Sequence, residues 1–380
     1  MIHMTGNSDR TAGMTGSKLP RLAHVIGSVN FGGIEIAQLN LCRHLGPDEA
    51  EQTFLPVLGG RGDLADQFAN AGAKVRHCPV RPVLSFPMRL YGVLRSLRPD
   101  VAVCHMSLLS GLVLTVARAA GVPKRIAWIH TSGKPYTAPR RLLRAILHPL
   151  LLRNATAVVA VNSVALRATV AEPDRWHGTA VTLANPVDTG RFAPQDRALC
   201  RQRFGLPADA FIAMHLGRAS AEKNRPFLVE VWRALRESGA DATLVFAGPG
   251  GSSDVTSRHP QAAHCPSIVF AGMVEDVPAL LGAADVLLLP SHWEGLGNAV
   301  LEALSCGVPA VVNDVAGPRE LASAVPGISI VDIRAGAAAW AAAAVRAAGN
   351  GPTDRQRLHQ AMAASPYAIG AAAAAWRALW

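Results

Sequence analysis

The chain alternates short apolar runs of β-strand type with longer segments of helical periodicity, and this alternation limits the folds that it can adopt. Such a pattern predicts βα units around parallel sheets, because each helix returns the chain to the edge where the next parallel strand begins. In the first half we expect strands at residues 21–26, 52–57, 75–78, 101–105, 125–130 and 157–161. In the second half we expect strands at residues 210–217, 242–247, 267–271, 286–290 and 309–313, and a weaker one at 328–331. The fold class is therefore α/β, with two doubly wound domains.

The division between the domains is expected in residues 183–194, which carry two prolines and a glycine between the two series of strands. A chain of 380 residues, half of them apolar, suits two cores better than one. The expected domains are residues 18–190 and 191–365. Residues 1–17 are polar and rich in Gly, Ser and Thr, which predicts a disordered arm. Residues 366–380 carry Trp376 and Leu379 near a helical spacing, and we expect a helix docked on the first domain.

Membrane-spanning segments, secretory signals and metal sites are not expected. The longest uncharged apolar runs fall short of the roughly 18 residues that a spanning helix requires. The N-terminus lacks the basic start and apolar centre of a secretory signal, so we predict a cytoplasmic protein. Six scattered cysteines without a C-x-x-C pair indicate reduced, buried thiols rather than disulfides or a zinc site.

The positive charge is confined to the first half of the chain. Residues 1–190 hold 21 Lys and Arg against 11 Asp and Glu, a net charge of +10, whereas residues 191–380 hold 16 of each. Between Asp100 and Glu172 there are nine basic residues and no acidic one. This asymmetry favours an anionic partner, which leaves a phosphorylated ligand, a membrane surface or a nucleic acid open.

A first candidate ligand loop is the run from the strand at 21–26 through Gly32 and Gly33 into a helix. Glycines at such a turn let the backbone approach a ligand, and the helix N-terminus favours an anion. The pattern is neither G-x-G-x-x-G nor followed by G-K-[ST], which weakens the dinucleotide and P-loop interpretations. A purely structural turn remains open.

A second candidate loop holds Arg218 and Lys223, directly after the first strand of the second half. Two cations five positions apart at the carboxyl end of a strand can converge on one diphosphate. The alternative is a pair of solvated surface side chains.

A third candidate comprises Glu294, in a glycine-containing loop, and Glu302, on the helix that follows. Eight residues of helical rise place the two carboxylates about 10 Å apart, which is too far to share a proton but suits two ends of a long ligand. Between them, the amides of Gly295 to Asn298 face outward at the helix N-terminus, where phosphate or a sugar hydroxyl can bind. The alternative is a helix that merely has a favourable acidic residue near its start.

In this order and spacing the motifs resemble the family 4 retaining glycosyltransferases of GT-B fold. They are Gly32-Gly33-x-Glu35, Gly217-Arg218…Lys223-Asn224, Asn185-Pro-Val-Asp188…Arg191-Phe192, Glu294-x7-Glu302 and Gly307-x-Pro309…Gly317-x-x-Glu320. The resemblance covers roughly residues 20–335 and is more specific in the second half. One departure is Asn185-Pro186 where many members have Asn-Gly, at a linker position. The resemblance implies two Rossmann-like domains facing across a cleft, an acceptor domain followed by a donor domain.

The resemblance also implies roles for the residues of the second half. Arg218 and Lys223 would bind the donor diphosphate and stabilise the leaving nucleotide. Glu302 would accept hydrogen bonds from the ribose, and Glu294 would hold hydroxyls of the transferred sugar. The Leu296, Gly297 and Asn298 amides would lie alongside.

Two residues of the first half complete the implied site. Gly33 would donate its amide to the phosphate, and His130 matches a family histidine near the sugar, although a histidine at a strand end is also common in packing. No metal and no cofactor are expected, because cationic side chains replace the metal. The implied reaction is front-face transfer with retention.

The acceptor side is indicated by residues 134–153, in which Arg140, Arg141 and Arg144 accompany a stripe of leucine and isoleucine. Such a basic amphipathic helix can lie on an anionic membrane, at the inner face for a cytoplasmic protein. The alternative is a domain helix that buries the stripe inward.

The sequence thus predicts a glycosyltransferase that moves a sugar from a nucleotide-diphosphate-sugar to an acceptor sugar or lipid-linked sugar. The expected setting is envelope polysaccharide, lipopolysaccharide or glycolipid synthesis. A soluble secondary-metabolite acceptor, and a GT-B epimerase or phosphorylase, remain alternatives. A non-catalytic anion or nucleic-acid binder is disfavoured, because aromatic residues are only 5% of the chain and the second half carries no net charge.

Overall fold

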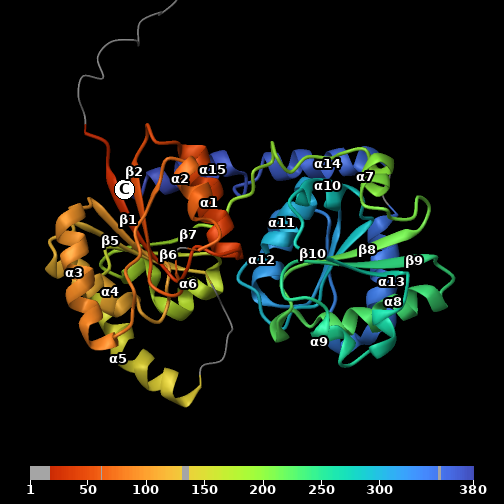
Figure 1. Cartoon of the computed structure of the whole chain (residues 1–380), viewed down its shortest axis with the longest axis horizontal. Coiled ribbons are helices and arrows are strands. Elements are labelled where there is room, and N and C mark those ends of the chain that lie inside the picture. The colour runs from red at the N-terminus through yellow and green to blue at the C-terminus, as the bar shows by residue number, and fades with distance from the viewer. Residues whose placement is uncertain (1–17, 61, 131–136, 350–351) are drawn as a thin grey trace, which may run out of the picture.

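The computed structural model describes residues 18–60, 62–130, 137–349 and 352–380 and consists of two α/β domains side by side (Figure 1). The arm predicted at residues 1–17 lies outside the described part. All the strand pairs that the model gives are parallel in both sheets. The predicted architecture of two Rossmann-like sheets is confirmed.

The first domain contains a seven-stranded sheet of order β3-β2-β1-β4-β5-β6-β7. Its strands are β1 (Arg21–Ile26), β2 (Glu51–Pro56), β3 (Lys74–Val75), β4 (Val101–Cys104), β5 (Lys124–Ile129), β6 (Ala157–Ala160) and β7 (Thr179–Thr182). Its helices are α1 (Gly33–Leu45), α2 (Ala65–Asn70), η1 (Val83–Ser85), α3 (Phe86–Leu97), α4 (Ser110–Ala119), α5 (Ala138–Asn154), α6 (Ser163–Thr169) and η2 (Pro173–Arg175).

The second domain contains a six-stranded sheet of order β10-β9-β8-β11-β12-β13. Its strands are β8 (Phe211–Leu216), β9 (Ala242–Ala247), β10 (Ile268–Gly272), β11 (Val286–Leu289), β12 (Ala310–Val312) and β13 (Ile328–Ile330). The first helices of this half are α7 (Arg197–Arg203), η3 (Ala221–Lys223), α8 (Arg225–Glu237), α9 (Ser253–Thr256), η4 (Pro260–Ala263) and α10 (Val277–Gly282). The remaining helices are α11 (Asn298–Ser305), α12 (Ala316–Ala324), η5 (Ile333–Ala335), α13 (Gly336–Ala348), α14 (Pro352–Ala363) and α15 (Ile369–Arg377).

Each predicted strand is present, with ends that coincide or differ by at most three residues, but β7 was not predicted. It is an edge strand of sequence TAVT whose four residues are all at least partly exposed. A strand with one paired edge and no buried face needs no apolar run, so the pattern that identifies buried strands is absent from it.

The C-terminal helix α15 returns to the first domain and packs on α1 (Figure 1). Trp376 is fully buried there, with its ring centroid 4.9 Å from that of Trp128 in β5. Arg377 forms a two-pronged ion pair with Glu49. The segment that leads into α15 pairs with the linker. Val187 N donates to Tyr367 O and Ile369 N donates to Val187 O, both at 2.9 Å.

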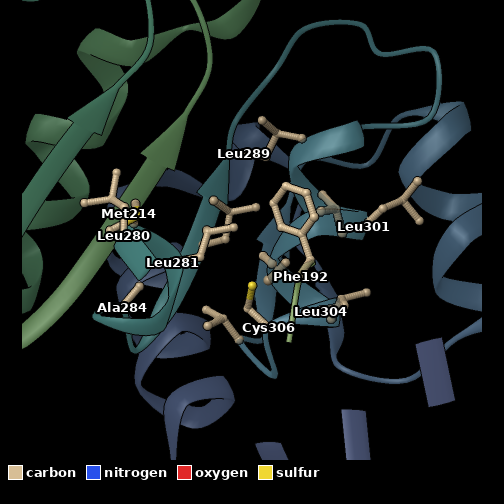
Figure 2. Close-up of a cluster of buried hydrophobic side chains, with 14 of the residues drawn as sticks. Phe192, Met214, Leu280, Leu281, Ala284, Leu289, Leu301, Leu304 and Cys306 are labelled. Atoms are coloured by element: carbon tan, nitrogen blue, oxygen red, sulfur yellow. The ribbon is translucent and has the colours of Figure 1, made fainter. Parts of the chain in front are cut away.

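The linker also contributes to the core of the second domain. Phe192 is buried and lies against Leu301, Leu304 and Cys306 of the α11 region (Figure 2). This contact anchors the linker beneath the helix that carries Glu302.

We predict that Phe192→Ala lowers the free energy of unfolding by about 3–5 kcal/mol, because it removes a buried aromatic ring and leaves a cavity. Urea denaturation followed by tryptophan fluorescence measures the change. Leu199→Ala on α7, where Leu199 is 65% exposed, is the control and should change the value by less than about 0.5 kcal/mol. Equal stability of the Phe192→Ala and Leu199→Ala proteins would contradict the anchoring role.

Candidate active site

The predicted site residues lie where the order of strands reverses in each sheet, between β1 and β4 and between β8 and β11. Ligands of open parallel sheets bind beyond the carboxyl ends of the strands at this point. Gly33 follows β1, Arg218 follows β8 and Glu294 follows β11, whereas His130 follows β5, the neighbour of β4.

The two predicted donor motifs are joined by an ion pair between Lys223 and Glu294. The Nζ of Lys223 lies 2.5 Å from Oε1 of Glu294, and the side chains are only 18% and 11% exposed. The Ser291 hydroxyl donates to the same carboxylate oxygen at 2.7 Å. The backbone N of His292 donates to the carbonyl of Glu222 at 2.8 Å, so the two loops are also held together through their backbones.

Arg218 is the exposed cation of the site. Its side chain is 65% exposed and lies 3.4 Å from Oε1 of Glu222. Glu35, in the first turn of α1, has a pKa raised by burial, and the charge of Arg218 partly offsets that rise. Arg218 therefore lies between carboxylates of the two domains.

The backbone of Gly295 lies against residues of both domains. A Cβ at Gly295 would overlap the carbonyl oxygen of His130, and a Cβ at Gly317 would overlap the carbonyl oxygen of Gly295. The same Gly295 carbonyl accepts a hydrogen bond from Nδ2 of Asn162, whose Oδ1 caps α6 by accepting from Ala165 N at 2.7 Å. Glycine is therefore required in this loop, and the residue that follows Glu294 is held against the backbone of His130.

A second set of contacts joins the start of α11 to the first domain. Asn298 donates from Nδ2 to the carbonyl of Gly33 at 2.8 Å, and Asn185 donates from Nδ2 to Oδ1 of Asn298 at 3.1 Å. Gly297 precedes the helix with φ of 94°, and Leu296 is buried. The N-termini of α1 and α11 therefore lie close together. We call this the interdomain seam, comprising Gly33, His130, Asn162, Asn185, Gly295 and Asn298.

Glu302 lies on α11 and is partly buried. Burial raises its pKa from 4.5 to about 7, and the charge of Arg191 only partly offsets this rise. Ligand hydroxyls that donate hydrogen bonds to the ionised carboxylate would stabilise the charged form and lower this pKa.

Several residues of this region were not predicted. His24 and His105 hydrogen-bond in a row with His130, and Glu320 accepts from Ser163 N and Oγ at 2.8 and 2.5 Å at the start of α6. Asn162 lies two residues beyond the end of β6, and His105 directly follows β4. Their polar side chains at strand carboxyl ends are the signal that could have identified them.

The predicted acceptor-side residues of α5 lie apart from this site, on a helix that packs against α4 and extends to the edge of the first domain (Figure 1). Leu142 and Ile146 are 68% and 59% exposed, and Arg140 and Arg141 are exposed beside them. Arg144 donates to the carbonyl of Ala168 at 2.8 Å. Only the second half of α5 buries its stripe, so the alternative of inward burial fails for the first half. Among the described residues, no helix is long and apolar enough to cross a bilayer.

Comparison with known proteins agrees with this architecture. Residues 32–186 match a family described as glycosyl transferase 4-like domain, and residues 210–350 match one described as glycosyl transferases group 1. HepE of Anabaena, solved with UDP and glucose, superposes with a TM-score of 0.77 at 18% identity over 94% of this chain and 98% of that one.

Two relatives carry informative names. EpsF of Bacillus subtilis, a glycosyltransferase by name, is 26% identical over 92% of this chain and 94% of its own length. A GDP-mannose-dependent α-(1-6)-phosphatidylinositol dimannoside mannosyltransferase of Mycobacterium tuberculosis is 37% identical over 39% of each chain.

The two domains have the GT-B fold. The chain belongs to the family 4-like, group 1 glycosyltransferases.

We predict that Glu302 reduces stability as the pH rises. Its pKa is about 7 in the folded protein against 4.5 when unperturbed, so the folded state binds the proton more tightly. The free energy of unfolding therefore falls as the pH rises from about 4.5 through 7. The free energy of unfolding of Glu302→Gln minus that of the wild type should be about 2 kcal/mol larger at pH 8 than at pH 5. This figure comes from 1.36 kcal/mol per pKa unit, reduced because the side chain is partly exposed.

Denaturant titrations at the two pH values measure this double difference. The exposed Glu237→Gln on α8 is the control and should show none. A Glu302→Gln protein whose stability relative to wild type is the same at both pH values would refute the buried, proton-binding carboxyl.

Proposed function

We propose that the protein transfers a sugar from a nucleotide-diphosphate-sugar to an acceptor with retention of anomeric configuration. The observation that carries the proposal is the placement of Lys223, Glu294 and Arg218. A buried cation–carboxylate pair and an exposed guanidinium lie together at the carboxyl end of the second sheet, next to two helix N-termini. This combination suits a ligand with an anionic diphosphate at one end and hydroxyls at the other.

In the proposed reaction, Arg218 and Lys223 bind the diphosphate and stabilise the charge that builds up as the bond between anomeric carbon and phosphate oxygen breaks. On donor binding, Lys223 exchanges part of its contact with Glu294 for phosphate oxygen, and Glu294 accepts hydrogen bonds from the sugar. Glu302 accepts from the ribose hydroxyls. The Leu296, Gly297 and Asn298 amides and the Gly33 amide complete the donor pocket, and these two cations make a metal ion unnecessary.

The acceptor proposed is a lipid-linked or phosphorylated sugar of polysaccharide or glycolipid synthesis, presented at the inner membrane face to a cytoplasmic, peripherally bound protein. The support is the exposed apolar and basic first half of α5 together with the net charge of +10 in residues 1–190. The name of the mycobacterial relative, which includes phosphatidylinositol dimannoside, points in the same direction.

The decisive test is a panel of UDP- and GDP-sugars with mass detection of released nucleotide and transferred or hydrolysed sugar. NMR of the first-formed sugar reads its anomeric configuration, and EDTA tests the absence of a metal requirement. A first product of inverted configuration would contradict retention. Calorimetry with nucleotides and with RNA separates a glycosyltransferase, which binds the nucleotide, from an RNA-binding protein.

We predict that Arg218→Ala and Lys223→Ala each lower kcat by about 10²–10³ at saturating donor, because each removes a preorganised charge from the departing diphosphate. Steady-state kinetics of nucleotide release measure the loss. Arg233→Ala, at an exposed position on α8, is the matched control and should retain full turnover. If either site variant turns over at the wild-type rate, this loop does not stabilise the leaving group.

We predict salt-reversible binding to anionic vesicles through α5. Each basic side chain near an anionic surface contributes roughly 1 kcal/mol, and the attraction decays within about 8 Å at physiological salt. In flotation, the protein should accompany anionic liposomes at low salt and leave them at high salt. The triple variant R140Q, R141Q and R144Q should lose the binding, whereas R233Q, R258Q and R346Q in the second domain should keep it. Failure of the wild type to float would favour a soluble acceptor.

A further inference from the structure

Three buried histidines form a row that runs from the interior of the first sheet to the interdomain seam. His24 lies in β1, His105 follows β4 and His130 follows β5, and these strands are neighbours. His24 Nδ1 lies 3.1 Å from His105 Nε2, and His105 Nδ1 lies 2.9 Å from His130 Nε2. None of the three is more than 5% exposed. Each hydrogen bond requires one donor and one acceptor, so the rings must share one direction of donation.

The seam determines that direction, because its last acceptor is a backbone carbonyl. Gly33 O can only accept, so Asn298 must point Nδ2 at it and Oδ1 at Asn185. Asn185 must then point Nδ2 at Asn298, which leaves its Oδ1 for the other side. Both amide orientations follow from one carbonyl.

Asn185 Oδ1 and His130 Nδ1 are complementary. Both atoms are buried, and among the described residues neither has a hydrogen-bond partner within ordinary distance. Burial lowers the pKa of His130 to about 3, and the Asn185 side chain partly offsets this effect, which indicates that the two side chains are neighbours. An oxygen facing a ring nitrogen requires that nitrogen to carry the proton.

The same direction of hydrogen-bond donation then holds for all three histidines. A neutral His130 with its proton on Nδ1 accepts at Nε2 from His105 Nδ1, and His105 Nε2 accepts from His24 Nδ1. Burial lowers the pKa of His24 to about 3 and that of His105 well below its usual value, so all three rings are neutral. His24 Nε2 is then a buried acceptor with no hydrogen-bond partner among the described residues.

We infer that His24, His105 and Asn185 are positioning residues that hold His130 as the neutral Nδ1–H tautomer. Through Asn185 they also fix the His130 ring to the interdomain seam. The inference rests on the proposed function, because His130 is the residue whose carbonyl lies against Gly295, next to Glu294. The Nε2 atom of His130 is committed to His105 and cannot exchange a proton with the sugar. His130 serves the reaction by fixing the Glu294 loop.

The tautomers can be read directly by NMR. In the full-length protein labelled with ¹⁵N-histidine, long-range ¹H–¹⁵N correlations distinguish Nδ1–H, Nε2–H and imidazolium rings. We expect Nδ1–H at positions 24, 105 and 130 from pH 5.5 to 8. An Nε2–H ring at His130, or its protonation in this range, would overturn the inference.

Asn185→Ala tests whether the seam sets the direction. Without the Oδ1 acceptor the row is free to reverse, so an Nε2–H population should appear at His24, at the opposite end of the row. Thr182→Ala in β7, where Thr182 is exposed, is the control and should leave the tautomers unchanged. Unchanged tautomers in Asn185→Ala would show that the seam does not control the row.

Kinetics test the positioning role. His105→Phe removes both hydrogen bonds and should lower kcat by roughly 10- to 100-fold with little change in nucleotide Kd. His105→Gln keeps one donor and one acceptor and should retain most of the turnover. Normal kcat in a folded His105→Phe protein would overturn the inference, and if that variant does not fold, the tautomers of Asn185→Ala decide. A wild type that turns over no donor would instead contradict the proposed function, with the NMR results still valid.

Discussion

The site depends on the backbone contact at Gly295, where the two domains approach with no side chain between them. The carbonyl of His130 lies on one side of this glycine, Gly317 lies on the other, and Asn162 binds the Gly295 carbonyl. A methyl group at position 295 would force these groups apart, because real Cβ atoms do not approach so closely. The position of Glu294, and through it that of Lys223, is therefore set by contacts with both domains.

The seam joins the domains through neutral hydrogen bonds and one carboxylate cap, whereas the buried ion pair lies within the second domain. Exchanging such hydrogen bonds for water changes the free energy little, since a typical one contributes about 1 kcal/mol net. Polar contacts of this kind favour relative domain motion. The donor charges can thus stay paired within their own domain while the seam opens.

The sequence was sufficient for the parts of the structure that follow a local pattern. Apolar runs identified the buried strands, and the loops at Arg218 and Glu294 were located because they follow such strands. It was not sufficient for β7, which has no buried face, nor for the largely exposed first half of α5. The contacts between the site residues could not be predicted for a different reason. Lys223 and Glu294 are 71 residues apart, and Asn162 and Gly295 are 133 apart, so no local spacing indicates that they meet. Asn162 also looks like an ordinary helix cap, which is one of the two roles it performs.

The return of α15 to the first domain has a consequence during translation. Ala372, Ala373 and Trp376 belong to the same buried cluster as Leu22 of β1 and Trp128 of β5. The ribosome adds them only after every strand of the second domain has been made. The first domain therefore begins to form early but waits for α15 to cover Trp128 and His24, while the second domain can close its sheet in the meantime. Until then Trp128 and His24 of the nascent first domain stay uncovered, and a helix synthesised after the whole second domain completes the core that was synthesised first.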